Sequence, residues 1–486
     1  MKKTILILTL LYFNLNAVTA QEVFSKINTK IKSPTSKNCV SIIDKEENIF
    51  TFFIGKNLIQ YNKISPQGKT LFTKEFSLAN NQVMKNSKGT RFSLFGYLLE
   101  GKYITADNMP TLLFSNSYRT GFYTIVFPSD GEGTPKLESF IIPSKNKKEK
   151  EKHLTSISGK DRVFIYKYVK NSSIVKAYEV SKTVDKISTL DFSGENFYNK
   201  QNKRCQLSDI WKLRKKENPL NIMSFGQNFM SNSILNYSFN SHFGSEMYQQ
   251  KDINYNNSLP SSIEIASEKV KFYAVGNHHI ITLNHRPSAT RIISINANNQ
   301  DTEVSHINIS MREFSNENSQ NNKVVSNSFI YKDKIYQFTS SSQRLHLSAY
   351  DLGNKKLIKE YKFTKDEDLT ILNAPIRQKG GTYAFGTERT LKKTSQLLRK
   401  LTRAKHSGLF VYEDDGKLNL VLGGYTEKRT ASIGFGPVAT TNNISLPNAS
   451  GGFTTHTITS FSQPIFNTYS SYSASKSVKA LSLIHI

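Results

Sequence analysis

Cysteine is nearly absent from this sequence: only Cys39 and Cys205 occur among 486 residues. No CxxC pair and no Cys/His spacing typical of a zinc site accompanies them. An oxidising compartment would allow the two to form a disulfide. They lie far apart in the chain, however, and two separate thiols are the alternative.

Long hydrophobic runs are also missing. The run 5–13 has about half of the roughly 20 residues that a membrane-spanning helix needs. Lys2 and Lys3 precede it and the compact residues 18–20 follow it, in the order typical of a cleavable secretory signal peptide. We expect residues 1–20 to be that peptide, and the mature chain, without a transmembrane segment, to be periplasmic, on the outer surface or extracellular. The alternative is an N-terminal membrane anchor.

Acidic residues are scarce relative to basic ones. The chain has 38 Asp and Glu against 65 Lys and Arg, a formal charge of +27. This charge attracts anionic polymers and surfaces without specificity. Lys and Asn are also the ordinary solvated residues of a protein from an AT-rich genome, so we expect no specific nucleic-acid partner.

Recognised catalytic and cofactor motifs are lacking. The chain has no GxSxG elbow and no phosphate-binding loop, and the segments 130–133 and 414–416 do not continue into an EF-hand. The best cluster is His278, His279 and His285. Neighbouring residues of a strand point to opposite faces, and no carboxylate stands beside these histidines. We therefore expect no cofactor and no metal site, with these three as weak candidates only.

A recurring four-strand pattern is what the sequence does contain. Short apolar strands separated by turns run through residues 327–363, and the same layout occurs in 40–76. Ile-Phe-Thr-Phe at 49–52 matches Ile-Tyr-Gln-Phe at 335–338. Similar units occupy the windows 40–76, 91–142, 155–192, 263–310, 323–363 and 370–425, and 205–260 has room for a seventh.

This pattern resembles the β-propeller superfamily in general layout, without the signature of any one family. The resemblance implies an all-β fold of seven four-stranded blades over residues 21–430, because a single meander cannot bury both faces and needs neighbours. A set of β-sandwich domains is the competing fold. An outer-membrane barrel fits less well, because the strands are short and do not alternate apolar with polar residues over the roughly 10 residues that a membrane-crossing strand requires.

Three segments interrupt or follow the pattern. Leucines among basic residues predict a helical insertion near 390–405, packed by its leucine face. A short helix at 208–216 is predicted, with Ser208 as N-cap and Ile210 and Leu213 inward. The Ser/Thr/Asn-rich stretch 431–480 is expected to be a closing strand or linker. The final residues 481–486 read like a translated sequencing adapter, which predicts a truncated natural C-terminus.

These observations predict an exported, non-catalytic recognition or scaffold protein of the bacterial envelope or extracellular space. Its partner would be an unidentified peptide, protein or glycan held by loops of the propeller. The alternative is a secreted hydrolase or lyase that acts on polysaccharide or peptide through an axial pocket. That alternative requires titratable residues gathered in one cleft.

Overall fold

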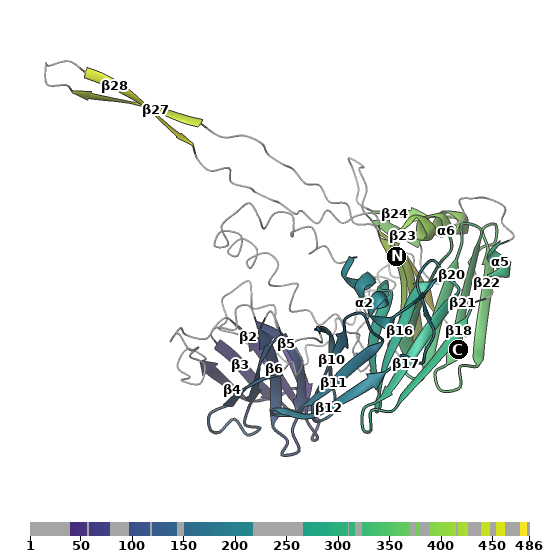
Figure 1. The fold of residues 1–486 in the computed structure, drawn as a ribbon, viewed down its shortest axis with the longest axis horizontal. Helices are drawn as coiled ribbons and strands as arrows, with labels where there is room; N and C mark the ends of the chain where they lie inside the picture. Colours follow the sequence, from purple (N-terminus) through teal and green to yellow (C-terminus); the bar gives the residue numbers. More distant parts are fainter. Residues whose placement is uncertain are drawn as a thin grey trace, which may run out of the picture. The chain divides into compact units, whose positions relative to one another are not determined.

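The computed structural model divides the chain into two compact units, Met1–Asn257 with Lys269–Ile307, and Ser258–Glu268 with Asn308–Ile486 (Figure 1). The structure describes residues 39–55, 58–77, 97–116, 119–142, 150–216, 266–309, 311–315, 323–369, 376–379, 388–414, 417–425, 439–447, 453–461 and 477–483. The expected signal peptide lies outside these residues. Cys39 and Cys205 are both free thiols.

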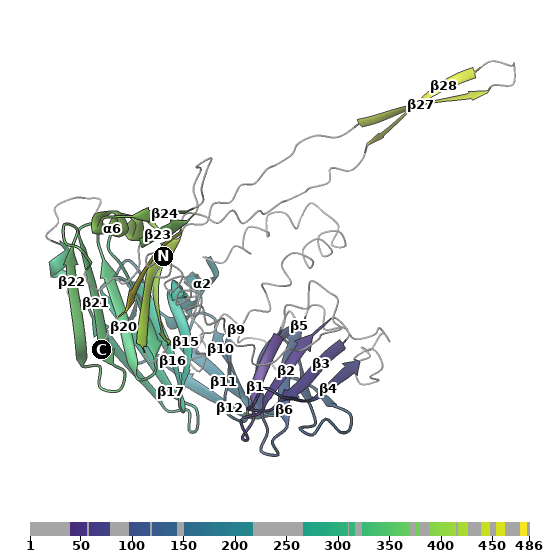
Figure 2. The same cartoon turned by 180° about the vertical axis from the view of Figure 1, so that it is seen from behind.

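The first unit contains four antiparallel sheets of four strands, each in sequence order. Strands β1 to β4 lie side by side in Figure 2. The strands are β1 Cys39–Ile43, β2 Ile49–Ile54, β3 Leu58–Ile64, β4 Thr70–Ser77; β5 Tyr97–Ile104, β6 Pro110–Asn116, β7 Gly121–Val126, β8 Lys136–Ile141; β9 Glu151–Ser158, β10 Val163–Val169, β11 Ile174–Val180, β12 Val184–Asp191; and β15 Val270–Val275, β16 His278–Arg286, β17 Ala289–Asn296, β18 Thr302–Asn308.

The first strands of successive sheets lie next to one another: β1 contacts β5, β5 contacts β9, and β9 contacts β15. Apolar side chains fill the space between sheets, and the aromatic pair Phe52 and Phe127, with ring centroids 4.9 Å apart, joins the first sheet to the segment after β7. The fourth strands are mostly exposed, as in β12, where Leu190 alone is buried. This is the blade arrangement of a β-propeller, in which successive meanders pack face to face through apolar side chains.

The second unit contains a fifth such sheet and one with five strands. The five-stranded order is β24-β23-β29-β26-β25, so β29 pairs with both β23 and β26. The strands are β19 Val325–Tyr331, β20 Lys334–Ser340, β21 Arg344–Asp351, β22 Leu357–Thr364; and β23 Ile376–Lys379, β24 Glu388–Leu391, β25 His406–Asp414, β26 Lys417–Tyr425 and β29 Ser477–Leu483.

The fold class expected from the sequence is confirmed: the described residues form an all-β structure built mainly from four-stranded antiparallel meanders of the β-propeller type. Six of the predicted windows hold a sheet. The seventh copy, 205–260, falls outside the described residues from 217 onward. The prediction for 370–425 needs correction, because strand β29, from far along the chain, lies between β23 and β26. Its backbone forms hydrogen bonds with both of these strands, which would otherwise have unpaired edges.

The late part of the chain contains three strands within its described segments. Strands β27 Ala439–Pro447 and β28 Phe453–Phe461 form a hairpin within the stretch predicted as closing strand or linker. Strand β29 includes residues 481–483 of the segment that resembles an adapter. The foreign origin of that segment stays a prediction.

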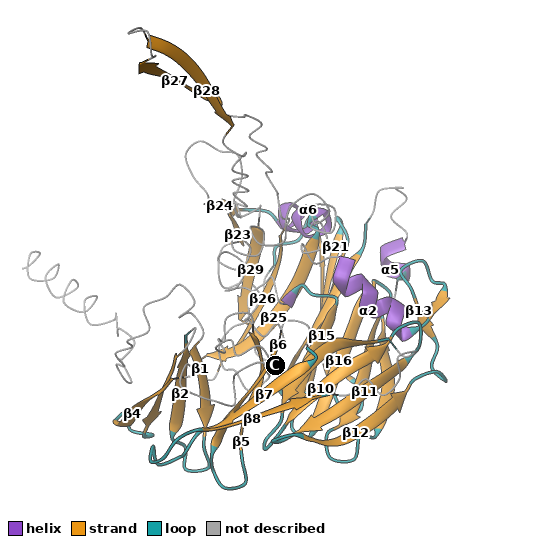
Figure 3. Cartoon of the chain, turned by 60° about the vertical axis from the view of Figure 1, so that its left-hand side comes forward, coloured by secondary structure: helices purple, strands orange, loops and turns teal. Residues whose placement is uncertain are grey.

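The described residues form few helices, which Figure 3 shows in purple beside the orange strands. They are α2 Leu207–Lys216, α5 Arg312–Ser315 and α6 Thr394–Arg403. In α6, Leu397, Leu398 and Leu401 are fully buried, so the predicted amphipathic insertion is confirmed. No helix in the described part of the chain is both long and apolar enough to cross a bilayer.

Helix α2 corrects one prediction. It begins at Leu207, so Ser208 lies inside the first turn and is not the N-cap. The carboxylate of Asp209, the third residue of the helix, instead accepts a hydrogen bond from the backbone N–H of Gln206 at 3.2 Å. This is the contact that the N3 side chain makes with the N-cap residue in a capping box. Ile210 is buried as predicted, whereas the side chain of Leu213 lies outside those described.

Candidate functional site

A buried carboxylate, Glu100, lies between the second and third sheets. The pairing of β5 with β6 shifts between Leu99 and Gly101, so Glu100 is the extra residue of a β-bulge. A bulge re-aims a side chain that regular pairing would direct elsewhere. Gly101 is required next to it, because a Cβ there would lie 2.5 Å from Cγ2 of Val163 on β10. The bulge and the glycine together bring Glu100 against the third sheet.

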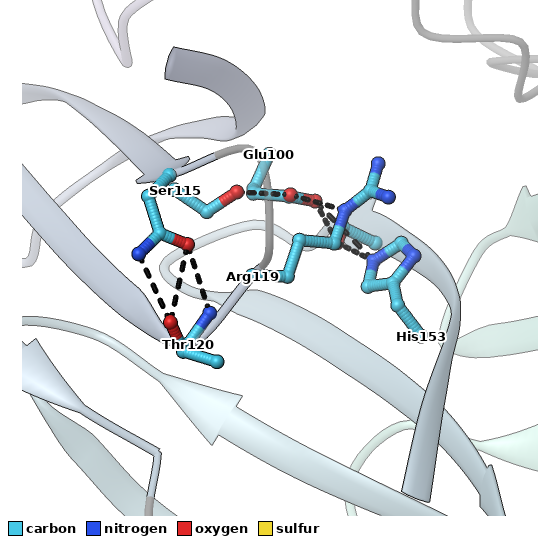
Figure 4. Close-up of polar contacts among 7 residues, drawn as sticks. Glu100, Ser115, Arg119, Thr120 and His153 are labelled. Carbon is cyan, nitrogen blue, oxygen red and sulfur yellow. Dashed lines mark hydrogen bonds and ion pairs between the residues drawn. The ribbon is translucent and has the colours of Figure 1, made fainter. Parts of the chain in front are cut away.

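Four side chains bind the Glu100 carboxylate (Figure 4). Ser115 Oγ and Arg119 Nε donate to Oε1 at 2.5 and 2.7 Å. Ser156 Oγ donates to Oε2 at 2.5 Å, and His153 Nε2 lies 3.3 Å from the same oxygen. Burial alone would raise the pKa of Glu100, but His153, Arg119 and Ser115 outweigh it and hold the pKa well below its usual range. Glu100 is therefore an ionised carboxylate.

The backbone of Arg119 has an unusual, left-handed conformation. Its φ is 55°, in the left-handed region that costs a residue other than glycine roughly 1–2 kcal/mol. The turn is held by Asn116, whose backbone carbonyl accepts from Arg119 N–H at 2.9 Å and whose side-chain oxygen accepts from Thr120 N–H at 2.9 Å. This conformation places the guanidinium on Glu100, and that ion pair offsets the cost.

A row of cations continues across the third sheet. Lys167 on β10 pairs in register with His153 on β9 and with Lys176 on β11, so all three side chains share one face. Lys176 Nζ lies 2.9 Å from Oε1 of Glu151, and Tyr178 donates its hydroxyl to Oε2 of Glu151 at 2.6 Å. Both oxygens of Glu151 are thus bound by residues other than Lys167.

Lys167 is the exception in this row. It is 9% exposed, and its ammonium lies 5.0 Å above the ring centroid of Tyr178. Among the described residues it has neither a hydrogen-bond acceptor nor a carboxylate partner within ion-pair distance. Burial lowers the pKa of Lys167, and the charges of Glu151 and Glu100 oppose that shift only in part.

The arrangement around Glu100 differs from a catalytic triad. In a triad the serine and the acid contact different nitrogens of the histidine. Here Ser156 Oγ, at 2.9 Å, and the Glu100 carboxylate contact the same nitrogen, Nε2 of His153. The serine hydroxyl donates to the carboxylate, and the carboxylate is saturated. The cluster can hold charge and position cations, but its Glu100 carboxylate is not poised to accept a proton.

The three histidines singled out from the sequence have three separate partners. His279 is buried and its Nδ1 lies 2.6 Å from the hydroxyl of Tyr166, whereas exposed His278 lies 3.2 Å from Ser294 Oγ. His285 Nε2 donates to the backbone oxygen of Tyr198 at 2.7 Å. Burial lowers the pKa of His279 to about 4 and also lowers that of His285.

All three histidines lie on strand β16. No three His, Cys, Asp or Glu side chains of the described segments converge as metal ligands would. Glu100 was overlooked, although a lone acidic residue before a glycine inside the apolar stretch 97–104 is the sequence signal of a bulge.

No family model matches this chain, and no curated protein sequence matches it. Solved structures with similar folds include the WD40 domain of SCAP from fission yeast, 8% identical over 93% of this chain and 96% of that one, with a TM-score of 0.27. Another is the Aleuria aurantia lectin in complex with alpha-methyl-L-fucoside, 9% identical over 88% and 96%, with a TM-score of 0.23.

A third similar structure is prolyl oligopeptidase B from Galerina marginata, 8% identical with a TM-score of 0.28. The alignment covers 79% of this chain and 46% of that enzyme, so this chain corresponds to less than half of it. At these TM-scores the similarities carry no argument about function, and the fold assignment rests on the sheets themselves.

Proposed function

We propose that this protein is an exported, non-catalytic recognition protein of the bacterial envelope or extracellular space, which binds a peptide, glycan or other envelope partner. The observation that supports this function is the saturation of Glu100. General acid–base catalysis needs a group with a pKa near the operating pH and a free position for the proton. Glu100 has neither, because four side chains occupy its oxygens and its pKa is held low.

The features around Glu100 instead favour a rigid binding surface. Arg119 and His153 are fixed by the same carboxylate from two different sheets. Side chains held in one geometry lose little entropy when a ligand binds, which is the basis of preorganised recognition. The net positive charge adds long-range attraction to anionic envelope polymers. Export itself is supported by the pattern of residues 1–20.

One observation favours the alternative, a secreted hydrolase or lyase. A lysine with a lowered pKa can act as a general base, and burial lowers the pKa of Lys167. This alternative predicts that Lys167→Arg, which keeps the charge but raises the pKa, abolishes turnover.

The test is a screen of the purified mature protein against a glycan panel and an envelope extract, with binding and product release measured together. Saturable binding without product supports the proposal. Saturable turnover that Lys167→Arg removes would refute it. Lys160→Arg is the control, because Lys160 is exposed in the turn between β9 and β10 of the same sheet.

A further inference from the structure

The basic side chains of Arg119, Lys167 and Lys176 lie beside the carboxylates of Glu100 and Glu151 between the second and third sheets. Each of these two carboxylates is already bound through both oxygens by side chains other than Lys167. Among the described residues, the Lys167 ammonium therefore has no carboxylate of its own.

The Lys167 ammonium is almost buried, which is costly. Removing an ammonium from water without a partner carries a large desolvation penalty, so buried lysines are normally paired. The Tyr178 ring compensates in part, because a cation above an aromatic face is attracted to it. Lys167 nevertheless makes no hydrogen bond through its three ammonium donors to the described residues. An anionic group supplied from outside would satisfy it.

Arg119 offers further donors beside the same carboxylate. Only its Nε is bonded to Glu100, and in Figure 4 both terminal nitrogens point away from that carboxylate. They make no hydrogen bond with the described residues. A guanidinium with two free nitrogens matches the paired oxygens of a carboxylate, sulfate or phosphate. Lys167 is the register partner of His153, and His153 and Arg119 both contact the Glu100 carboxylate, so the two cations lie on either side of one cluster.

We propose that Lys167 and Arg119 bind an anionic group, a carboxylate or sulfate, of an acidic polysaccharide. The inference rests on the proposed recognition function for the identity of the polymer that carries the group. A polysaccharide with many anionic groups matches both these two cations and the net charge of the whole chain.

The first experiment concerns the anion site alone and uses small ions. In wild-type protein, sulfate or acetate added at constant ionic strength in place of chloride should raise the pKa of Lys167, followed by NMR of the lysine side-chain nitrogen. An unchanged pKa of Lys167 would overturn the proposal.

The second experiment measures the Kd for polygalacturonate, for heparin and for single-stranded RNA. Lys167→Met should weaken polysaccharide binding about tenfold, the typical loss of one charge-assisted hydrogen bond. Lys160→Met removes the same charge from an exposed turn and should change the Kd less than about twofold. Lys167→Met should fold, since it replaces an unpaired buried charge by an apolar side chain.

The outcomes separate this inference from the proposed function. Equal weakening by both substitutions would reduce the effect to net charge and overturn the inference. Binding of a neutral glycan or peptide that Lys167→Met leaves intact would also overturn it, while the recognition function stands. Tighter binding to RNA, lost in Lys167→Met, would overturn the polysaccharide assignment. Catalytic turnover would instead refute the proposed non-catalytic function.

Discussion

The hydroxyl of Ser156 donates a 2.5 Å hydrogen bond to the carboxylate of Glu100, across 56 residues of sequence and between two sheets. Glu100 stands on β5, the first strand of the second sheet, and Ser156 on β9, the first strand of the third. Their contact joins the two blades at their inner strands by charge-assisted bonding, beside the apolar contacts of the same interface.

Replacing Glu100 by Gln should destabilise the first unit by about 2 to 4 kcal/mol. The substitution leaves Arg119 and His153 without their negatively charged partner, and breaking a buried ion pair is costly. Because Arg119 is one-third exposed, water compensates for part of this loss. Chemical denaturation at neutral pH measures the loss. Glu132→Gln, in an exposed turn of the same sheet, is the matched control and should change stability by less than about 0.5 kcal/mol.

The same variant has a pH signature. The folded pKa of Glu100 lies below its unfolded value, so its stabilisation is complete above an unfolded pKa of about 4.3 and declines only as the pH falls through the folded value. The gap between wild type and Glu100→Gln should therefore stay open from neutral pH down to about pH 5. A gap that closes near pH 7 would contradict the assignment.

Acidification should also destabilise the protein through His279. Its pKa is about 4 when folded against about 6.5 when unfolded, because burial beside Tyr166 disfavours the charged ring. The neutral form is stabilised by folding, so this contribution is present above pH 6.5 and is lost as the pH falls towards 4. The loss amounts to about 3 kcal/mol at most.

Denaturation curves at several pH values compare His279→Gln with His278→Gln. Between pH 6.5 and 4, the free energy of unfolding of His279→Gln should fall less steeply with decreasing pH than that of the wild type. His278→Gln should keep the wild-type slope, because His278 is exposed and its Nδ1 lies beside the hydroxyl of Ser294. Equal slopes in both variants would show that His279 is not the titrating group.

Asn327 should tolerate no exchange of its amide for a carboxylate. Its Nδ2 donates to the backbone oxygens of Ser267 at 3.0 Å and Ser407 at 2.9 Å, inside the second unit. Asn327→Asp keeps the shape but places negative oxygen against carbonyl oxygen, so we expect a loss of about 3 kcal/mol or more. Asn354→Asp is the control, since the Asn354 side-chain oxygen accepts from Lys356 N–H and Asp can do the same. Thermal unfolding of both variants measures the difference.

Gly408 should not accept a methyl group. An added Cβ would lie 2.6 Å from the carbonyl carbon and oxygen of Ala266 and from Cα of Ser267, which are backbone atoms with little freedom to move. Gly408→Ala should cost about 1 to 3 kcal/mol in the second unit. At Gly194 nothing lies within 4 Å of the same position, so Gly194→Ala should leave the unfolding midpoint nearly unchanged. Similar losses at both sites would contradict this account.

Local features of the chain determined the blades. Apolar runs of strand length, separated by polar turns, predicted sheets that the structure contains almost residue for residue in 40–76 and 327–363. The leucine spacing of 390–405 predicted α6. These predictions hold because strand alternation, turn residues and helical periodicity depend on neighbours a few positions away.

The partners of Glu100 and the late strand β29 depended on the tertiary structure alone. Ser115, Arg119 and His153 come from three other segments, and they meet only because a bulge, a left-handed residue and the stacking of two sheets bring them together. Strand β29 enters its sheet more than 50 residues after β26. No local pattern encodes contacts of that kind, because they arise from which surfaces pack once the sheets exist.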